Sequence, residues 1–94
     1  MKFTCNEIKN QTNIEQRGLP LLFAELMFND AMLAREDTRK EYPERRYIGY
    51  NKIDGRLMVV VFCLPSIDHV HIISFRKAID ILPAVNGGDS QYRY

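Results

Sequence analysis

The sequence predicts an α+β fold in which two N-terminal helices pack on an antiparallel β-meander. Five segments show the periodicity of regular structure, in the order helix 5–17, helix 20–29, strand 45–52, strand 56–64 and strand 69–76. The Asp54-Gly55 pair between the first two strands is typical of a two-residue hairpin turn. With 94 residues the chain can build one hydrophobic core, so we expect a single domain over residues 1–78. Pro83 and Gly87-Gly88 disfavour a long helix beyond it, and residues 79–94 are expected to form an irregular tail.

The first helix is expected to begin at a capping box, with Thr4 as the N-cap residue and Glu7 three positions later. Gly18 stands where a left-handed C-terminal cap would end the helix. The apolar stripe is thin, because Ile8 and Ile14 do not share a helix face well. We therefore expect much of this helix to be solvated.

The second helix has a stronger apolar pattern. Pro20 suits its first turn. Apolar residues four positions apart form a stripe, namely Leu22 with Leu26 and Phe23 with Met27. These side chains are predicted to lie in the core.

The segment before the sheet is polar. Residues 31–35 are compatible with a short strand, and residues 36–41 form a mixed-charge loop that we expect to be the most mobile segment. In the middle strand, the continuous apolar run from Leu57 to Leu64 predicts that both sheet faces are covered. This run of eight residues is the longest apolar run in the chain. A membrane helix needs roughly 20 such residues, so no membrane contact is expected.

The register of the strands decides which arginines meet. If Asp54-Gly55 is a two-residue loop, Arg56 lies on the sheet face shared by alternate residues of the middle strand. If Leu64 then pairs with Val70, Arg76 falls on that same face. A bulge or a one-residue slip would instead place the two arginines on opposite faces.

The overall composition excludes few classes of function. The formal charge of +1 gives no sign of nucleic-acid binding, so any basic surface must come from local clustering. Cys5 and Cys63 are expected to be reduced structural cysteines, and no Cys–His spacing suggests zinc. The N-terminus turns polar before any signal-peptide core appears, and we expect a cytoplasmic protein.

Several short motifs occur in a characteristic order. They are Arg-Tyr-Ile-Gly at 46–49, Asp-Gly-Arg-Leu at 54–57, Val-Val-Val-Phe at 59–62 and Ile-Ile-Ser-Phe-Arg-Lys-Ala at 72–78, preceded in the first helix by Glu7, Lys9, Asn13 and Gly18. Together they resemble the BrnT family, toxins of type II toxin–antitoxin pairs with a fold related to the RelE ribonucleases. The chain departs from the family pattern at Gln16-Arg17, where the family usually has Lys-His, and at His71, where it commonly has Arg.

The resemblance implies a RelE-like fold and a metal-independent endoribonuclease that needs no cofactor. It also implies RNA as the target and a cognate BrnA-like antitoxin, with which the chain is expected to form a hetero-oligomer. The alternative that we keep open is a non-catalytic relative, an inhibitor or decoy that binds protein or nucleic acid on the same fold.

RNA cleavage without a metal requires an activated 2′-hydroxyl, stabilised charge on phosphorus and a protonated 5′-oxygen. Guanidinium groups suit the second task, and we predict Arg56 and Arg76 as a shared phosphate clamp. Glu44 is predicted as general base, or else as an ion-pair partner of Arg46. His71 is the candidate proton shuttle, although strand parity places it opposite Arg76, where a half-buried structural histidine is the simpler interpretation. Supporting RNA contacts are predicted at Arg17, Arg46, Tyr47 and Lys77.

Overall fold

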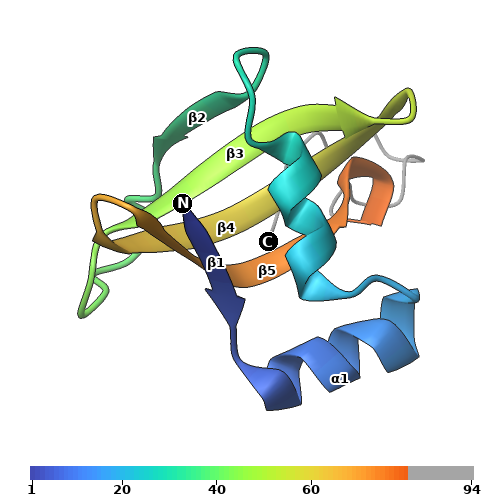
Figure 1. The fold of residues 1–94 in the computed structure, drawn as a ribbon, viewed down its shortest axis with the longest axis horizontal. Coiled ribbons are helices and arrows are strands. Elements are labelled where there is room, and N and C mark those ends of the chain that lie inside the picture. The colour runs from blue at the N-terminus through green and yellow to red at the C-terminus, as the bar shows by residue number, and fades with distance from the viewer. Residues whose placement is uncertain (81–94) are drawn as a thin grey trace.

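Five strands form one mixed sheet in the order β1-β5-β4-β3-β2 (Figure 1). The computed structural model describes residues 1–80. Its elements are β1 (Lys2–Cys5), α1 (Glu7–Arg17), the 3₁₀ helix η1 (Leu21–Met27), β2 (Leu33–Glu36), β3 (Arg46–Ile53), β4 (Arg56–Ser66), β5 (His69–Lys77) and the 3₁₀ helix η2 (Ala78–Asp80). The predicted irregular tail lies outside the described residues, except for residues 79 and 80 in η2.

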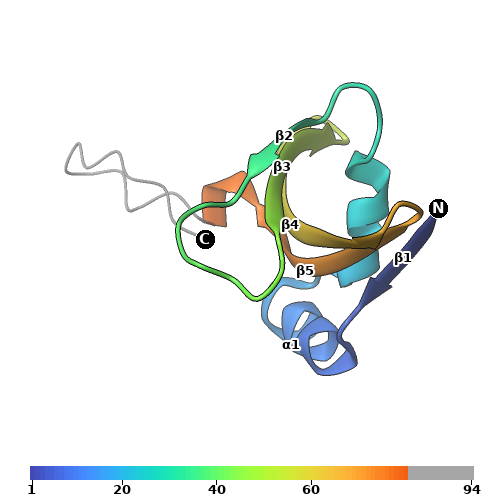
Figure 2. The same cartoon turned by 90° about the vertical axis from the view of Figure 1, so that its left-hand side faces the viewer.

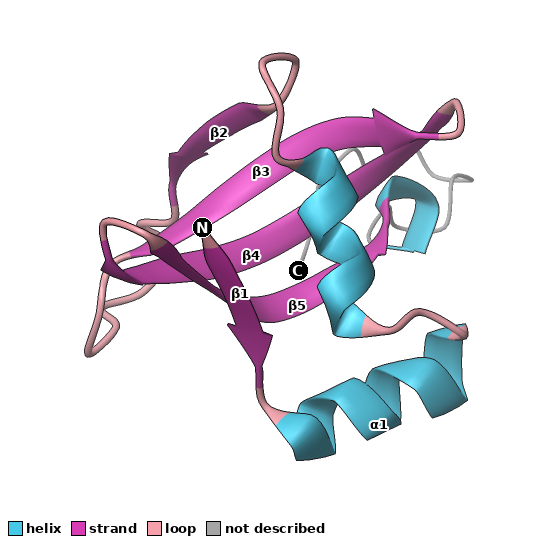
Figure 3. Cartoon of the chain, in the orientation of Figure 1, coloured by secondary structure: helices cyan, strands magenta, loops and turns pink. Residues whose placement is uncertain are grey.

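The predicted RelE-like arrangement of two helices on an antiparallel meander is wrong (Figure 3). Strands β2 to β5 do form an antiparallel meander, but β1 pairs in parallel with β5 and makes the sheet mixed. The second helix is a 3₁₀ helix of seven residues, not an α-helix. Residues 2–5, expected to lead into the first helix, extend the sheet instead.

The start of α1 differs from the expected capping box. Asn6 is the N-cap residue, and its side chain accepts a hydrogen bond of 3.0 Å from the backbone N–H of Lys9. Thr4 lies in β1, where its hydroxyl contacts histidine side chains of β5. The predicted end of the helix is confirmed, because Gly18 adopts a left-handed conformation with φ of 67°.

The two faces of the sheet are covered differently. On one face, which we call the η1 face, buried side chains of η1 pack against the sheet core: Leu21, Ala24 and Met27 against Met58, Val60, Phe62 and Phe75. On the opposite face, Ile48, Val59 and Val61 are buried. Figure 2 shows the β2–β3 loop, residues 37–45, on the side of the sheet away from η1. We call this second face the loop face.

The predicted hairpin register is confirmed. Asp54 and Gly55 have φ of 51° and 77°, the pair of positive values that a type I′ turn requires. Ile53 therefore pairs with Arg56, and the rest of the β3–β4 ladder follows in step.

The next ladder departs from its predicted register within β5. Phe62 pairs with Ile72 as expected, but Val61 pairs with Ser74. Ile73 is thus an extra residue in β5, a β-bulge. Because side chains alternate between faces, one extra residue exchanges the faces of all side chains beyond it.

The bulge overturns the predicted pairing of two arginines. Arg76 lies opposite Val59 and therefore on the loop face. Alternation along β4 instead puts Arg56 on the η1 face, with Met58 and Val60. The expected shared clamp of Arg56 and Arg76 is therefore wrong. His71 precedes the bulge and pairs with Cys63, as the predicted register has it, so Arg76 is the residue that changes face and joins His71 on the loop face.

Helix α1 covers the edge of β5 that β1 leaves open. β1 pairs only with residues His69 to Ile72, so the backbone of β5 beyond them has no strand on that side. The buried amide of Asn13 donates hydrogen bonds to the carbonyl oxygens of Phe75 (3.0 Å) and Leu19 (2.8 Å). Its oxygen accepts a bond of 3.1 Å from Arg17. Asn13 therefore ties α1 to the sheet. In the described residues, no helix is long and apolar enough to cross a membrane.

Replacing Asn13 by alanine is predicted to destabilise the fold by about 1–3 kcal/mol, because the buried carbonyl group of Phe75 and the partly buried one of Leu19 would lose their donor. The free energy of unfolding in urea measures this loss. Gln11→Ala, on an exposed position of the same helix, is the control and should change stability by less than about 0.5 kcal/mol. Equal stability of the two variants would contradict the assigned role of Asn13.

Candidate functional site

A hollow of about 320 Å³ lies on the loop face, between the β2–β3 loop and β5. Its lining comes from the loop, from β3 and from the centre of the sheet: Asp37, Arg39, Lys40, Tyr42, Arg46, Val61, Ile73, Ser74 and Arg76. Four of these side chains are cationic and one is a carboxylate, so the lining of the hollow carries a net positive charge. Guanidinium groups gathered in this way suit a phosphate group.

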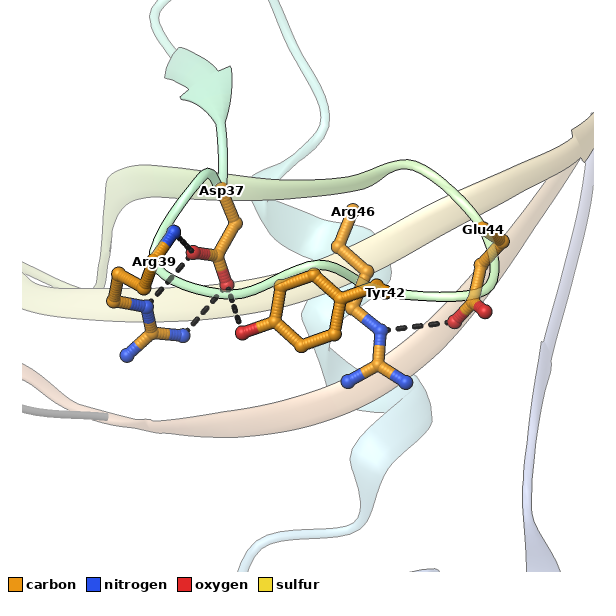
Figure 4. A network of polar contacts seen from close by, with 5 residues as sticks. All are labelled: Asp37, Arg39, Tyr42, Glu44 and Arg46. Carbon is orange, nitrogen blue, oxygen red and sulfur yellow. Dashed lines mark hydrogen bonds and ion pairs between the residues drawn. The ribbon is translucent and has the colours of Figure 1, made fainter.

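Asp37 anchors the loop beside this hollow (Figure 4). Its side chain is fully buried, with 0% exposed, and accepts three hydrogen bonds from Arg39, at 2.6, 2.8 and 3.1 Å. The hydroxyl of Tyr42 donates a fourth at 3.1 Å. The backbone N–H of Asp37 donates to the carbonyl of Arg46 at 2.7 Å. These bonds orient Arg39 and Tyr42 before any ligand arrives.

The hydrogen bonds from Arg39, helped by its charge and by Tyr42, hold the pKa of Asp37 at about 2, below its usual value of 3.8, although burial acts in the other direction. Asp37 therefore stays ionised at neutral pH. Its chemistry is that of a structural anchor and not of a proton carrier.

Arg46 is held on the other side of Tyr42 from Arg39 (Figure 4). Its Nε donates to a carboxylate oxygen of Glu44 at 2.8 Å. Its guanidinium carbon lies 4.3 Å from the centroid of the Tyr42 ring, a cation–π contact. Within residues 1–80, the terminal nitrogens of Arg46 make no hydrogen bond. They are therefore available to an anion in the hollow.

His71 lies on the same face, two strands away from Arg46. The residues Arg46, Cys63, His71 and Thr4 form one row across β3, β4, β5 and β1. The Thr4 hydroxyl oxygen lies 2.8 Å from Nδ1 of His71 and 2.7 Å from Nε2 of His69. Because Nδ1 of His71 is occupied, its Nε2 is the nitrogen left for proton transfer. Burial raises the pKa of the Cys63 thiol between them, which keeps this thiol protonated.

The site residues predicted from the sequence divide between the two faces. Four of them, Glu44, Arg46, His71 and Arg76, lie on the loop face or in the loop beside it. The other four are Tyr47, Arg56 and Lys77 on the η1 face and Arg17 at the end of α1. Tyr47 stacks on Phe62 with ring centroids 5.6 Å apart. The structure does not bring this second group to the hollow, and its roles stay predictions.

Four residues of the hollow, Asp37, Arg39, Lys40 and Tyr42, were not predicted from the sequence. The first three belong to the mixed-charge segment 36–41 that was expected to be mobile, and Tyr42 follows it. No local pattern distinguishes the buried Asp37 from the exposed acidic residues next to it. Its role becomes visible only once the loop folds back onto the sheet.

Chemically, the hollow can bind a phosphate ester, and two groups able to exchange protons, Glu44 and His71, lie on the same side of the sheet but do not line the hollow. Arg46 and Arg76 supply guanidinium groups to the hollow. Glu44 places a carboxylate beside Arg46, and His71 places an imidazole on the same face. These are the groups that acid–base cleavage of a phosphodiester requires.

Comparison with known proteins identifies a family and a solved structure that the chain resembles. A family model described as the ribonuclease toxin BrnT of type II toxin–antitoxin systems matches residues 6–80. Among solved structures, the chain is similar to the crystal structure of the ribonuclease toxin BrnT of Brucella abortus. That match has 26% sequence identity and a TM-score of 0.58, and covers 83% of this chain and 96% of the other. No curated protein matches the sequence.

Asp37 is predicted to stabilise the fold by roughly 2 kcal/mol at neutral pH. Since its folded pKa of about 2 lies below the unfolded value, the unfolded state binds a proton first, and this stability is lost as the pH falls from about 4 to about 2. Asp37→Asn should lower the free energy of unfolding at pH 7 and flatten its pH dependence in that window. Urea denaturation at a series of pH values measures both.

Asp30→Asn, at an exposed turn position, is the matched control and should leave both quantities unchanged. A pH profile of Asp37→Asn that coincides with that of the wild type would show that Asp37 is not the anchor.

Proposed function

Because the chain belongs to the BrnT family of ribonuclease toxins of type II toxin–antitoxin systems, we propose that it is an endoribonuclease toxin whose active site is the hollow on the loop face. The family implies an RNA target and an antitoxin partner. The observation that carries the proposal is the convergence of Arg46 and Arg76 on one hollow whose lining carries a net positive charge. A BrnA-like protein is proposed as the antitoxin.

The scissile phosphate lies between Arg46 and Arg76 in this proposal. Both guanidinium groups line the hollow from different strands, β3 and β5. Charge on the phosphorane increases as the 2′-oxygen attacks, and fixed cations stabilise that state more than the ground state. The anchoring of the loop by Asp37 holds Arg39 close by, and Arg39 adds to the positive potential. This replaces the clamp of Arg56 and Arg76 predicted from the sequence.

Glu44 and His71 carry the protons. Glu44 removes the proton of the 2′-hydroxyl, and the 2′-oxygen bonds to phosphorus. The bond from phosphorus to the 5′-oxygen breaks, and that oxygen takes a proton from Nε2 of His71. The products are a 2′,3′-cyclic phosphate and a free 5′-hydroxyl. The hydrogen bond from Nε of Arg46 supports this assignment, because it holds the Glu44 carboxylate beside a guanidinium group of the hollow.

Arg46→Ala and Arg76→Ala are each predicted to reduce the rate of RNA cleavage by about 100-fold or more, because each removes a donor to the phosphorane. The assay is digestion of a defined RNA by purified protein in the presence of a chelator. Arg45→Ala, one residue away and 76% exposed in its side chain, is the matched control and should cleave like the wild type.

Arg56→Ala distinguishes the hollow from the clamp predicted from the sequence. If Arg56→Ala is as impaired as Arg76→Ala while Arg46→Ala is active, the hollow is not the active site. If the wild type does not cleave RNA with or without added divalent ions, the chain is a non-catalytic relative.

The proton-transfer roles predict a bell-shaped dependence of kcat/KM on pH in the wild type. Glu44→Gln should lose the acidic limb and His71→Ala the basic limb, each with a loss of about 100-fold or more at the optimum. Measuring kcat/KM across pH 4–9 for the three proteins tests the assignment. Retention of the full bell shape in His71→Ala would show that this histidine is structural.

A further inference from the structure

The helix η1 is apolar on its outer side as well as on its inner side. Leu21, Ala24 and Met27 are buried against the sheet. Phe23 and Leu26, on the outer side of the same helix, are 55% and 63% exposed. Contiguous exposed apolar side chains on a small protein are typical of an interaction surface.

One hollow lies on the η1 face beside this apolar area, and a second lies at the adjoining end of the sheet, where Leu57 and Ala78 belong to the loop face. The first, of about 310 Å³, is lined by Phe23, Leu26 and other side chains of the core, with Arg56 and Lys77 at one end. The second, of about 450 Å³, is lined by Arg56, Leu57, Lys77 and the two apolar residues that begin η2. Arg56 and Lys77 line both hollows, so they form a cationic ridge between two apolar areas.

Within residues 1–79, whose side chains the structure describes, no ion pair includes Arg56 or Lys77. Asp54 lines the first hollow but forms no ion pair with either of them. A ligand that brings a carboxylate to the ridge would meet two cations that these residues leave unpaired.

We propose that this η1 surface, made of Phe23, Leu26, Arg56, Leu57, Lys77 and Ile79, docks the antitoxin through a segment with apolar side chains on either side of a carboxylate. The inference rests on the proposed function, in which the chain is a toxin with a protein partner. Apolar side chains fill the two hollows, and the carboxylate pairs with the ridge between them.

The chemistry of the surface favours a protein over RNA. Phe23 is the one exposed aromatic side chain among those that define this surface, and the others beside the cations, Leu26, Leu57 and Ile79, are aliphatic. RNA-binding surfaces usually supply several stacking partners for bases, whereas aliphatic side chains suit an apolar protein segment. The ridge also lies on the opposite face of the sheet from the hollow that contains Arg46 and Arg76. The antitoxin at this position binds without filling the phosphate site.

The test uses the full chain and, as probe, the purified protein encoded by the gene adjacent to the toxin gene. The Kd of the complex is measured by calorimetry for the wild type, for the double variant Phe23→Ser/Leu26→Ser and for Arg56→Glu. Ile67→Ser is the matched control, because Ile67 is 92% exposed and lies at the β4–β5 turn, at the other end of β4 from Arg56. Thermal melting verifies that each variant is folded.

The proposal expects Kd to rise about tenfold or more in the double variant and in Arg56→Glu, since truncated or reversed anchors weaken interfaces by such factors. Ile67→Ser should bind the partner with the Kd of the wild type. In the absence of the partner, the double variant should cleave RNA at the rate of the wild type. Unchanged affinity of the folded double variant and Arg56→Glu would overturn the proposal. So would a loss of affinity confined to Arg46→Ala and Arg76→Ala, or an absence of any complex with the wild type.

Failure of the proposed function gives a different pattern. If the wild type does not cleave RNA but the complex forms and is weakened by the η1 variants, the docking surface holds and the ribonuclease assignment fails. If affinity for RNA falls in Arg56→Glu while affinity for the adjacent gene product does not, the ridge is an RNA contact and the proposal is overturned.

Discussion

Between Val61 and Phe62, the pairing of β4 with β5 shifts by one residue, and Ile73 remains as the extra residue in β5. The alternation of side chains along a strand makes this shift decisive. Up to Ile72 the η1 face receives the apolar side chains that the core needs, and beyond the bulge Phe75 takes the same role. Ser74 and Arg76 are turned to the loop face in consequence. Without the bulge Arg76 would lie beneath η1, far from Arg46.

The second constraint is the anchoring of the β2–β3 loop. The buried, ionised Asp37 accepts four hydrogen bonds from Arg39 and Tyr42 of the same loop, which fix the loop's conformation. The backbone N–H of Asp37 donates to the carbonyl of Arg46 at the start of β3 and ties the loop to the sheet. The bonds to the Asp37 carboxylate orient Arg39 and Tyr42, and Tyr42 supports Arg46. The cations are thus placed before the substrate binds, which reduces the entropy lost on binding. In the two proposals above, the phosphate site is on the loop face and the cationic ridge of Arg56 and Lys77 is on the η1 face, so substrate and protein partner would occupy separate faces of one sheet.

Local signals predicted the local parts of this structure. Asp54-Gly55 predicted the β3–β4 hairpin and its register, because only a turn with two positive φ angles fits that spacing. Gly18 predicted the end of α1 for a similar reason. Non-local features were missed. β1 pairs with a strand some 65 residues away, and nothing in Lys2–Cys5 distinguishes an edge strand from the approach to a helix.

The site was predicted in its parts but not in its assembly. The sequence singled out four residues of the site one by one, namely Arg46, Arg76, Glu44 and His71. It did not show that Arg76 shares a face with Arg46, because no glycine or other sequence signal marks the bulge at Ile73.

The proposed function requires that Arg46 and Arg76 meet at one phosphate. The most direct measurement is NMR of the arginine Nε–H resonances during titration with a 2′-deoxy RNA analogue that cannot be cleaved. We expect saturable shifts of the Arg46 and Arg76 resonances, with the Arg56 resonance unaffected. Joint shifts of Arg56 and Arg76 with Arg46 unaffected would contradict this requirement.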